Sequence, residues 1–422
     1  MHSGALLDLT QDLLREVLRF DAPADAVVVA FGRRHRRLGS RERHLLAETV
    51  FALLRRRLYY EHLAQGGDGS QERRLAILAW QGQGSDLAAA LDPATAAWRE
   101  QALAVDPATL PEATRHNLPD WLAAALRRQL DRETEFTALA QSLLEPAPLD
   151  LRVNLLRGKR EAALQALAAD GVVASPTPWS PWGLRVHGKP SLTKTRAFQR
   201  GDIEVQDEGS QLLALLLDAR RGEMVVDFCA GTGGKTLALG ASMRNTGRLY
   251  AFDTSGHRLD ALKPRQARSG LTQVYPVQIA HERDDRIDRL VGKIDRVLVD
   301  APCSGLGTLR RNPDLKWRQS ARDLESLGQR QQAILGAAAS LLKPGGRLVY
   351  ATCSLLHAEN EAVAEAFEQG QGRAFGRLDA AQALGAAHVP QAAALCDGPN
   401  LRLWPHRHGT DGFFGAAWTR LR

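Results

Sequence analysis

Cysteine is scarce in this chain, and its spacing argues against two common kinds of site. The 422 residues contain four cysteines, far apart and with no CxxC pair, namely Cys229, Cys303, Cys353 and Cys396. Structural zinc sites use closely spaced pairs of ligands, so we expect no metal centre. Disulfide frameworks are typical of short secreted chains, so we expect the four thiols to be reduced.

Long hydrophobic runs are also missing. The early apolar run AVVVAF (26–31) is too short to span a membrane, and acidic residues lie on its amino-terminal side at Asp8, Asp12 and Glu16. These features predict neither a signal peptide nor a membrane span, and therefore a cytoplasmic protein. A hydrophobic content of 44% against 24% charged residues describes a globular chain with ample core material, long enough for two to three domains.

The formal charge of +7 is modest, but the basic residues are unevenly distributed. The sequences RRHRR, RERH and RRR all fall within residues 33–57. Such clusters suit a polyanionic partner. The alternative interpretation is a solvated helix face with no partner.

The chain divides into three stretches with different patterns. Residues 1–145 show apolar residues at helical spacing, for example in the predicted helices 6–20 and 43–64, and they predict an all-helical domain. Residues 146–204 follow the linker sequence EPAP and predict a small α+β domain. Residues 205–422 alternate strand-like and helical patterns, which indicates a parallel sheet.

In the third stretch, seven short apolar runs predict strands. They lie at 223–229, 248–253, 274–280, 295–301, 347–353, 401–405 and 413–421. A helix is expected at 330–342, followed by a turn at the sequence KPGGR (343–347).

A glycine-rich loop, CAGTGGK (229–235), joins the first of these strands to a helix. Gly231, Gly233 and Gly234 allow the backbone to approach a ligand closely. Asp253 ends the next strand, where nucleotide-binding sheets place the acidic residue that binds ribose hydroxyls.

Three ligands compete for this loop. A dinucleotide site needs GxGxxG, which the glycine spacing does not match. A phosphate-binding P-loop needs a glycine where Cys229 stands, although GGKT fits its end. S-adenosylmethionine needs the acidic strand end and the glycine loop without a phosphate cradle, and the sequence favours it.

Two cysteines stand at the ends of strand-like runs, Cys303 in RVLVDAPCSG and Cys353 in GRLVYATCS. If these runs are neighbouring parallel strands, both thiols lie on the rim where open α/β sheets bind ligands. Few reactions need two thiols at one rim, and methylation of cytosine at carbon 5 is one. The alternative is that both cysteines are small buried hydrophobic residues.

Methylation at carbon 5 requires a thiolate to add to carbon 6, an acid near ring nitrogen 3, and a base that removes the carbon 5 proton. Asp300 supplies a carboxyl group beside Cys303, and Lys235 is a candidate for stabilising the thiolate or orienting the base. The residues alone do not decide which of the two cysteines attacks.

At these residues the sequence resembles the RsmB/NOP/Sun family of RNA cytosine-5 methyltransferases. The matching segments are DFCAGTGGKT, LVDAPCSGLGTLRRNPDLKW, YATCSLLHAENE and WPHRHGTDGFFGAAWTRL, with IEVQDEGSQ, LPDWL and LRVN upstream. The resemblance is specific over 200–422, moderate over 115–200 and weak over 1–115, where bacterial members carry a helical RNA-binding domain.

The resemblance implies roles for individual residues. Cys353, in the TCS motif, would be the nucleophile, and Cys303, in the PCS motif, would assist breakdown of the covalent adduct. Asp300 would also lie near the cytosine. The implied contacts to S-adenosylmethionine are Cys229, Ala230, Gly231, Thr232, Gly233, Gly234, Lys235, Asp253 and Asp300.

Two departures from the family pattern matter. Gly231 and Thr232 replace the alanine and proline of the usual CAAPGGK, which preserves close approach of the backbone. The third strand ends in QIAHERDD (278–285), where the family usually has an aspartate for the adenine. His281 or Glu282 is nearest that place, and the contact is left unassigned.

The resemblance therefore implies a class I (Rossmann-like) S-adenosylmethionine methyltransferase domain with a small α+β domain that guides RNA and an all-helical RNA-binding domain. The expected substrate is RNA, most specifically small-subunit ribosomal RNA, and the expected state is a monomer. The basic clusters of 33–57 then favour an RNA contact. The alternatives are a P-loop nucleotide hydrolase and a non-catalytic RNA-binding protein on a methyltransferase scaffold.

Overall fold

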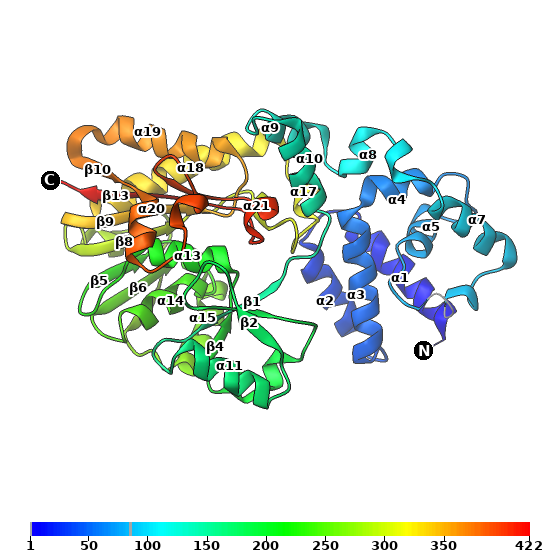
Figure 1. The fold of residues 1–422 in the computed structure, drawn as a ribbon, viewed down its shortest axis with the longest axis horizontal. Coiled ribbons are helices and arrows are strands. Elements are labelled where there is room, and N and C mark those ends of the chain that lie inside the picture. Colours follow the sequence, from blue (N-terminus) through cyan, green and yellow to red (C-terminus); the bar gives the residue numbers. More distant parts are fainter. Residues whose placement is uncertain (1, 84–86) are drawn as a thin grey trace. The chain divides into compact units, whose positions relative to one another are not determined.

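The computed structural model describes residues 2–83 and 87–422, which form two compact units. The helical unit comprises Met1–Pro146 and Thr308–Ala321, and the sheet unit comprises Ala147–Gly307 and Arg322–Arg422. Figure 1 shows helices throughout the amino-terminal part and a large sheet in the carboxy-terminal part.

The helical unit packs around leucine-rich faces of its first helices. Leu7, Val50 and Leu75 are fully buried there and belong to one hydrophobic cluster. The helices are α1 (Ser3–Val17), α2 (Ala24–Arg34), α3 (Ser40–Arg55), α4 (Arg57–Leu63), α5 (Gln71–Leu78), α7 (Pro93–Leu103), α8 (Glu112–His116), α9 (Asp120–Arg127) and α10 (Glu133–Ser142).

The single helix predicted over 43–64 is wrong in one respect. It is divided into α3 and α4 at Arg56, whose φ of −121° and ψ of 37° are not helical. Hydrophobic periodicity continues across the break, because both helices bury apolar residues in the same core.

A distant segment, Thr308–Ala321, folds with the helical unit. Within that unit, the Ala24 backbone N–H donates to Asp314, 3.2 Å away, and the Trp317 indole N–H donates to the Leu54 carbonyl at 2.9 Å. Lys316 is 2% exposed and its ammonium donates to the Arg55 carbonyl. Burial and then the charges of Arg55 and Arg56 lower the pKa of Lys316 to about 7. The sequence division had assigned this segment, which contains α17 (Leu315–Arg318), to 205–422.

Within the sheet unit, a small four-stranded antiparallel sheet has the order β2-β3-β1-β4. Its strands are β1 (Leu149–Val153), β2 (Ala174–Pro176), β3 (Gly183–Val186) and β4 (Ile203–Val205), with α11 (Arg160–Ala169) and α12 (Arg196–Gln199). Arg152 on β1 is 2% exposed and donates to the Gly234 carbonyl at 2.8 Å. The small sheet therefore contacts the glycine loop directly.

The large sheet confirms the predicted α/β class. Its order is β11-β12-β13-β9-β8-β5-β6-β7, with β10 paired to β13. The five strands from β9 to β7 in this order are parallel, and the pairings of β10, β11, β12 and β13 are antiparallel. The strands are β5 (Met224–Asp227), β6 (Arg248–Asp253), β7 (Val274–Gln278), β8 (Ile294–Asp300), β9 (Leu342–Thr352), β10 (Phe375–Leu378), β11 (Cys396–Asp397), β12 (Asn400–Leu403) and β13 (Phe413–Arg420).

All seven predicted runs are strands, whereas the turn predicted at 343–347 is wrong. These residues belong to β9, and the pairing with β8 passes from Ile294↔Leu342 to Arg296↔Arg347. The sequence KPGGR is thus accommodated as an irregularity within a paired strand, as glycines in strands often are.

Helices cover both faces of the large sheet (Figure 1). One face packs against α13 (Glu208–Leu217), α14 (Gly234–Ser242), α15 (Gly256–Ser269) and α20 (Ala380–Ala386). The other packs against α16 (Asp285–Asp288), α18 (Ala321–Ser340) and α19 (Glu361–Gln371). Two buried faces explain why the central strands are continuously apolar.

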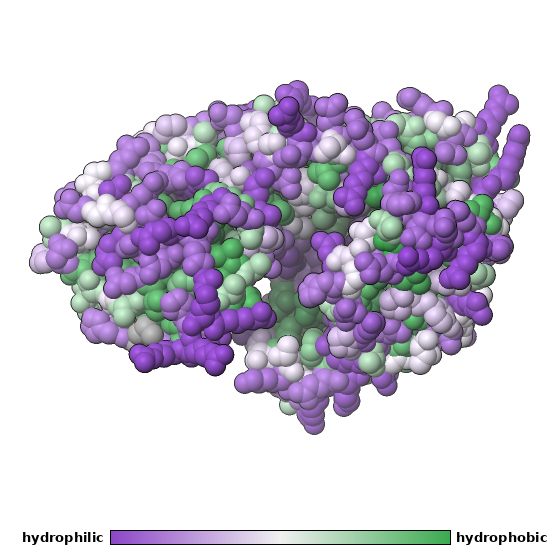
Figure 2. Space-filling model, turned by 180° about the vertical axis from the view of Figure 1, so that it is seen from behind, coloured by the Kyte–Doolittle hydropathy of each residue, from purple (hydrophilic) through white to green (hydrophobic). Residues whose placement is uncertain are grey.

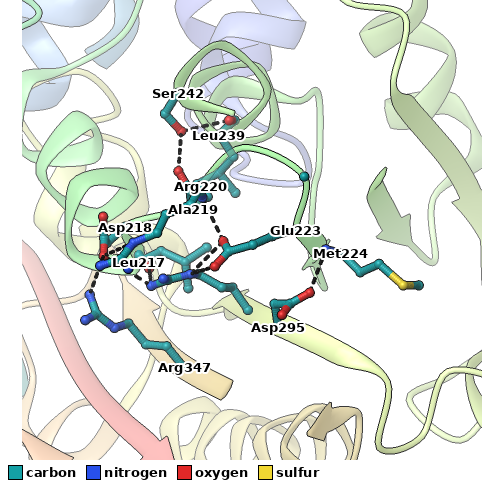
Figure 3. Close-up of polar contacts among 12 residues, drawn as sticks. Leu217, Asp218, Ala219, Arg220, Glu223, Met224, Leu239, Ser242, Asp295 and Arg347 are labelled. Carbon is teal, nitrogen blue, oxygen red and sulfur yellow. Dashed lines mark hydrogen bonds and ion pairs between the residues drawn. The ribbon is translucent and has the colours of Figure 1, made fainter. Parts of the chain in front are cut away.

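Ion pairs and hydrogen bonds fix the amino-terminal ends of the parallel strands (Figure 3). Glu223, just before β5, pairs with Arg296 of β8 at 2.8 Å, and the Met224 N–H donates to Asp295 at 2.8 Å. Arg347 of β9 donates to the Leu216 carbonyl at 3.1 Å. This network holds the end of the sheet opposite to the rim where the strands finish.

Among the described residues, the exposed large hydrophobic side chains are scattered along the sequence and include Val29, Val173 and Tyr275. On the face that Figure 2 shows, hydrophilic residues make up most of the outline. Within residues 2–83 and 87–422, no helix has both the length and the apolar content needed to cross a membrane.

Replacing Trp317 tests whether the 308–321 segment stabilises the helical unit. Trp317→Ala removes the hydrogen bond to Leu54 and the ring on which the Arg57 guanidinium lies. We expect a loss of roughly 2–3 kcal/mol in the free energy of unfolding and faster tryptic cleavage within the segment. Urea denaturation and limited proteolysis measure these effects. Val29→Ala, at a position 52% exposed, is the control, and equal behaviour of the two variants would contradict the assignment.

Candidate active site

The candidate site lies where the parallel strands end. The glycine loop follows β5, Asp253 ends β6, and Asp300 ends β8. Cys303 follows β8 by three residues and Cys353 follows β9 directly. Because β8 and β9 are parallel neighbours, with Asp300 opposite Ala351, both thiols reach one rim as expected.

A cavity of about 940 Å³ opens at this rim beside β5. The strand order switches there, because β6 and β7 lie on one side of β5 and β8 and β9 on the other. Its lining unites the predicted site residues apart from Gly233. The predicted residues in the lining are Cys229, Ala230, Gly231, Thr232, Gly234, Lys235, Asp253, Asp300, Cys303 and Cys353.

The glycine loop needs glycine at two positions. Gly233 has a φ of +86°, and a β-carbon there would lie 2.0 Å from Leu262. Gly231 has a φ of +56°, and nothing lies within 4 Å of where its β-carbon would be. Gly233 therefore serves packing, which explains its absence from the cavity lining, and Gly231 leaves the backbone accessible from the cavity.

Asp253 is 7% exposed and held in a fixed orientation. Its carboxylate accepts hydrogen bonds from the backbone N–H groups of Gly231 at 2.8 Å and Ser255 at 2.7 Å. A carboxylate has about four acceptor positions, so further positions remain for a ligand.

Lys235 and Asp300 form an ion pair in the lining of the cavity. The Lys235 ammonium lies 2.7 Å from the Asp300 carboxylate. Burial acts to lower the pKa of Lys235, but the charge of Asp300 and its hydrogen bond, followed by Cys353 and Asp227, raise it, and the net direction is upward. Lys235 is therefore a cation, placed near the thiol of Cys353.

The two thiols are adjacent. The Cys303 and Cys353 sulfur atoms lie 3.4 Å apart. The hydrogen bond with Cys353 and then burial raise the pKa of Cys303 well above its ordinary value, and the nearby charges of Cys353 and Glu359 act in the same direction. Cys303 is thus a poor source of thiolate but, once deprotonated, a strong base.

Two further titratable groups lie at or near the site. Asp227, at the end of β5, is 1% exposed, and burial raises its pKa to about 7 although the hydrogen bond from Thr236 acts the other way. Burial likewise raises the pKa of Cys229 well above its ordinary value, so this thiol is neutral. Sequence reasoning missed Asp227. The only available signal was a lone charge in an apolar strand beside the glycine loop.

The third strand leads into a loop that reaches the cavity at Ile279, Ala280, His281 and Glu282. Asp284 does not line the cavity, because its carboxylate accepts from the backbone N–H groups of Ala280 at 2.8 Å and Arg286 at 3.0 Å. The loop backbone thus uses the available aspartate as a cap. His281 and Glu282 are the polar side chains that this loop contributes to the cavity.

Sequence reasoning also missed a set of buried polar residues behind the two cysteines. Ser304 and Ser354 each follow one of the cysteines, and both donate to Glu359. Gln331 donates to the same carboxylate from α18. Glu359 was visible only as part of the segment YATCSLLHAENE.

The residues that the structure describes contain no group of three or more histidine, cysteine, aspartate or glutamate side chains arranged to hold a metal ion. The parallel strand order, the glycine loop, the acidic end of β6 and the cavity at the switch point together define a class I methyltransferase fold. S-adenosylmethionine is the cofactor of that class.

Comparison with known proteins agrees with this class. Residues 214–419 match the family described as 16S rRNA methyltransferase RsmB/F, and residues 118–193 match the ferredoxin-like domain of RsmF/B-like methyltransferases. The fold matches the solved structure of PH0851 with a TM-score of 0.80 over 100% of this chain and 99% of that one, at 24% identity.

Two curated relatives are similar in sequence. A probable ribosomal RNA small subunit methyltransferase B from Synechocystis sp. is 37% identical over 71% of this chain, and the match spans 66% of that protein, just under two thirds. The ribosomal RNA small subunit methyltransferase B of Sodalis glossinidius is 33% identical over 74% of this chain and 68% of its own length. The chain belongs to the RsmB/F methyltransferase family, and the resemblance noted in the sequence is confirmed.

Family membership overturns the P-loop alternative. Cys229 already fitted a phosphate loop poorly, and the Lys235 ammonium is bound to Asp300. The lysine that a P-loop would use to bind phosphates is therefore paired with a carboxylate here.

Replacing Asp227 tests its raised pKa through stability. An unfolded aspartate titrates near ~3.9, and folded Asp227 near about 7. The folded state therefore holds a proton that the unfolded state releases, and stability falls as pH rises from about 4 to about 7.

We expect Asp227→Asn to be as stable as the parent at pH 4 and more stable at pH 8 by roughly 2–4 kcal/mol. Urea denaturation at the two pH values measures the difference. A gap that is independent of pH would contradict the assignment.

Proposed function

We propose that this protein transfers a methyl group from S-adenosylmethionine to carbon 5 of cytosine in RNA, with small-subunit ribosomal RNA as the substrate. The observation that carries the proposal is the 3.4 Å separation of the Cys303 and Cys353 sulfur atoms, in the same cavity as the glycine loop and Asp253. Reactions that use S-adenosylmethionine on a more reactive nucleophile need no such pair of thiols.

The residues present fit the cofactor. Asp253 has acceptor positions for ribose hydroxyls, Gly231 leaves the backbone open to the cavity, and the loop is braced by Arg152 at Gly234 and by Arg265 at Thr232. When bound, S-adenosylmethionine supplies an electrophilic methyl group. The surrounding residues then orient the cytosine and manage its protons.

Cys353 is the nucleophile in this proposal, a role carried over from the TCS motif of the family. Its thiolate adds to carbon 6 of the cytosine while ring nitrogen 3 takes a proton from the Lys235–Asp300 pair, so that carbon 5 becomes nucleophilic. That proton returns to the pair when the adduct breaks down. The Lys235 ammonium stabilises negative charge close to Cys353, and Asp300, paired with Lys235 at 2.7 Å, faces the base.

Cys303 completes the cycle. After methyl transfer, carbon 5 carries both a methyl group and a proton, and the adduct cannot break down until that proton leaves. Cys303 first loses its own thiol proton to solvent, and its thiolate then accepts the carbon 5 proton. The bond between carbon 6 and the Cys353 sulfur breaks, and the thiolate of Cys353 is regenerated. The raised pKa of Cys303 makes its thiolate, once formed, a strong base.

An RNA substrate agrees with part of the basic surface. Arg33, Arg36, Arg37 and Arg41 are exposed on the helical unit. The RRR sequence at 55–57 is instead used internally, because Arg55 donates to the Arg310 carbonyl and Arg57 pairs with Glu61. Phosphate contacts by the exposed arginines would place the RNA, and the target base would be unstacked to reach the cavity.

The two cysteine variants test the roles directly. Cys353→Ala should abolish transfer of labelled methyl to ribosomal RNA and form no covalent adduct. Cys303→Ala should accumulate a protein–RNA adduct that survives denaturing gel electrophoresis. The opposite pattern would mean that Cys303 is the nucleophile and Cys353 assists release. Methyl transfer by both variants at the parental rate would mean that the two cysteines are only small buried hydrophobic residues.

The cofactor contact of Asp253 has its own test. Asp253→Asn removes the charged acceptor, and we expect the Kd for S-adenosylmethionine to rise roughly 10–100-fold, the range for a lost hydrogen bond to a charged group. Isothermal titration calorimetry measures it. Asp260→Asn is the matched control, since Asp260 is exposed on α15. Equal affinities of the two variants would contradict the assignment.

A further inference from the structure

We propose that Glu359 is a positioning residue whose carboxylate ties together the loops that carry Cys303 and Cys353 and so sets the spacing of the two thiols. This inference rests on the proposed function for the importance of that spacing. The hydrogen bonds from the two loops to the Glu359 carboxylate, called the clamp below, are a property of the folded chain. They can be tested without any methyl transfer.

The carboxylate of Glu359 contacts the residue that follows each cysteine. One oxygen accepts from the Ser304 backbone N–H at 2.7 Å, and the other accepts from the hydroxyls of Ser304, at 2.5 Å, and Ser354. The two serine hydroxyl oxygens lie 3.3 Å apart. One side chain thus holds both cysteine loops, which come from different strands.

The remaining contacts tie Glu359 to the scaffold. Gln331, on α18, donates to the carboxylate at 3.1 Å and to the Pro302 carbonyl, just before Cys303, at 2.9 Å. The Tyr350 hydroxyl donates to the Glu359 carbonyl. The clamp is therefore anchored to a helix and to β9 as well as to the two loops.

The energetics favour a positioning role over a role in stability. Glu359 is fully buried, and a buried carboxylate is costly unless its acceptor positions are filled. Four donors fill them here, two on each oxygen. An apolar side chain in the place of Glu359 would stabilise the fold as well or better. The buried carboxylate is therefore explained by the fixed orientation that its charge-assisted hydrogen bonds give to the two loops.

Spacing matters because the two thiols act in sequence on adjacent carbons of one base. Displacing a reacting group by about 1 Å can reduce a rate by about 100-fold. The loops have a second tie, from the Gly307 N–H to the Cys353 carbonyl at 2.8 Å, and Asn360 donates to the Ser354 carbonyl at 3.0 Å. These bonds keep the loops folded when Glu359 is replaced, so an effect on spacing can be separated from unfolding.

The first experiment uses methyl transfer. Glu359→Gln should lower kcat by roughly tenfold or more while the Kd for S-adenosylmethionine changes by less than about twofold, because the glycine loop follows β5 and Asp253 ends β6, away from Glu359. Ser304→Ala should lower kcat by about threefold in the parent and have little further effect in Glu359→Gln, since the two groups act as one unit.

Glu365→Gln, an exposed carboxylate on α19, is the matched control for loss of charge and should retain parental activity. A parental kcat in Glu359→Gln, or fully additive losses in the double variant, would overturn the proposal. Circular dichroism and thermal melting establish that each variant is folded.

The second experiment needs no activity and keeps the carboxylate in place. In the free protein, diamide takes two electrons and two protons from Cys303 and Cys353 and leaves a disulfide, which peptide mapping by mass spectrometry quantifies. The variant with both Ser304→Ala and Ser354→Ala should cross-link at least about fivefold more slowly than the parent, because the sulfur atoms must approach to about 2.05 Å. Cross-linking at the parental rate would overturn the clamp.

The two experiments separate the two proposals. Absence of methyl transfer in the parent protein would overturn the proposed function while cross-linking still decides the clamp. Should Glu359→Gln fail to fold, the serine variants carry both measurements.

Discussion

Asp300 lies opposite Ala351 where β8 and β9 run parallel, so the two strands end side by side and deliver the cysteine that follows each of them to one rim. The positions of Asp300 and of both thiols at the rim depend on this pairing. Both faces of the sheet are buried by helices, and ion pairs such as Glu223–Arg296 fix its far end, so neither strand can slip without exposing core residues. A register shift of one residue would separate thiols that now lie 3.4 Å apart.

Charge at the rim is balanced within a small volume. Asp300 and Asp227 lie near Lys235, whose ammonium bonds to Asp300, and Asp253 in turn lies near Asp227. Burial favours the neutral form of Asp227, and backbone N–H groups hold Asp253 in place. The outcome is one carboxylate in an ion pair, one carboxylate held by backbone N–H groups and one buried carboxyl group with a raised pKa. The same type of residue takes three different states because its surroundings differ.

Much of the catalytic sheet was predictable because its strands are short apolar runs that end in polar or small residues. Asp253 and Cys353 could be placed at strand ends without coordinates. The interruption at Arg56 was not predictable, since the hydrophobic pattern continues through it. The sequence KPGGR predicted a turn, and only its place within β9 beside β8 shows it as an irregularity in a paired strand. The 308–321 segment was assigned with its sequence neighbours, whereas Trp317 and Lys316 make their contacts with the helical unit through hydrogen bonds to Leu54 and Arg55.

The sequence by itself determined the class of fold, the glycine loop, the acidic strand end and the two strand-terminal cysteines, because these depend on local patterns of residue type. Only the tertiary structure decided how close the thiols lie, which cation accompanies Asp300, and which buried carboxylate holds the two loops. Those outcomes depend on side chains far apart in the sequence, such as Ser304, Gln331 and Glu359. Sequence periodicity does not predict these contacts. A carboxylate is buried only where the fold brings hydrogen-bond donors to it, and those donors come from distant parts of the chain.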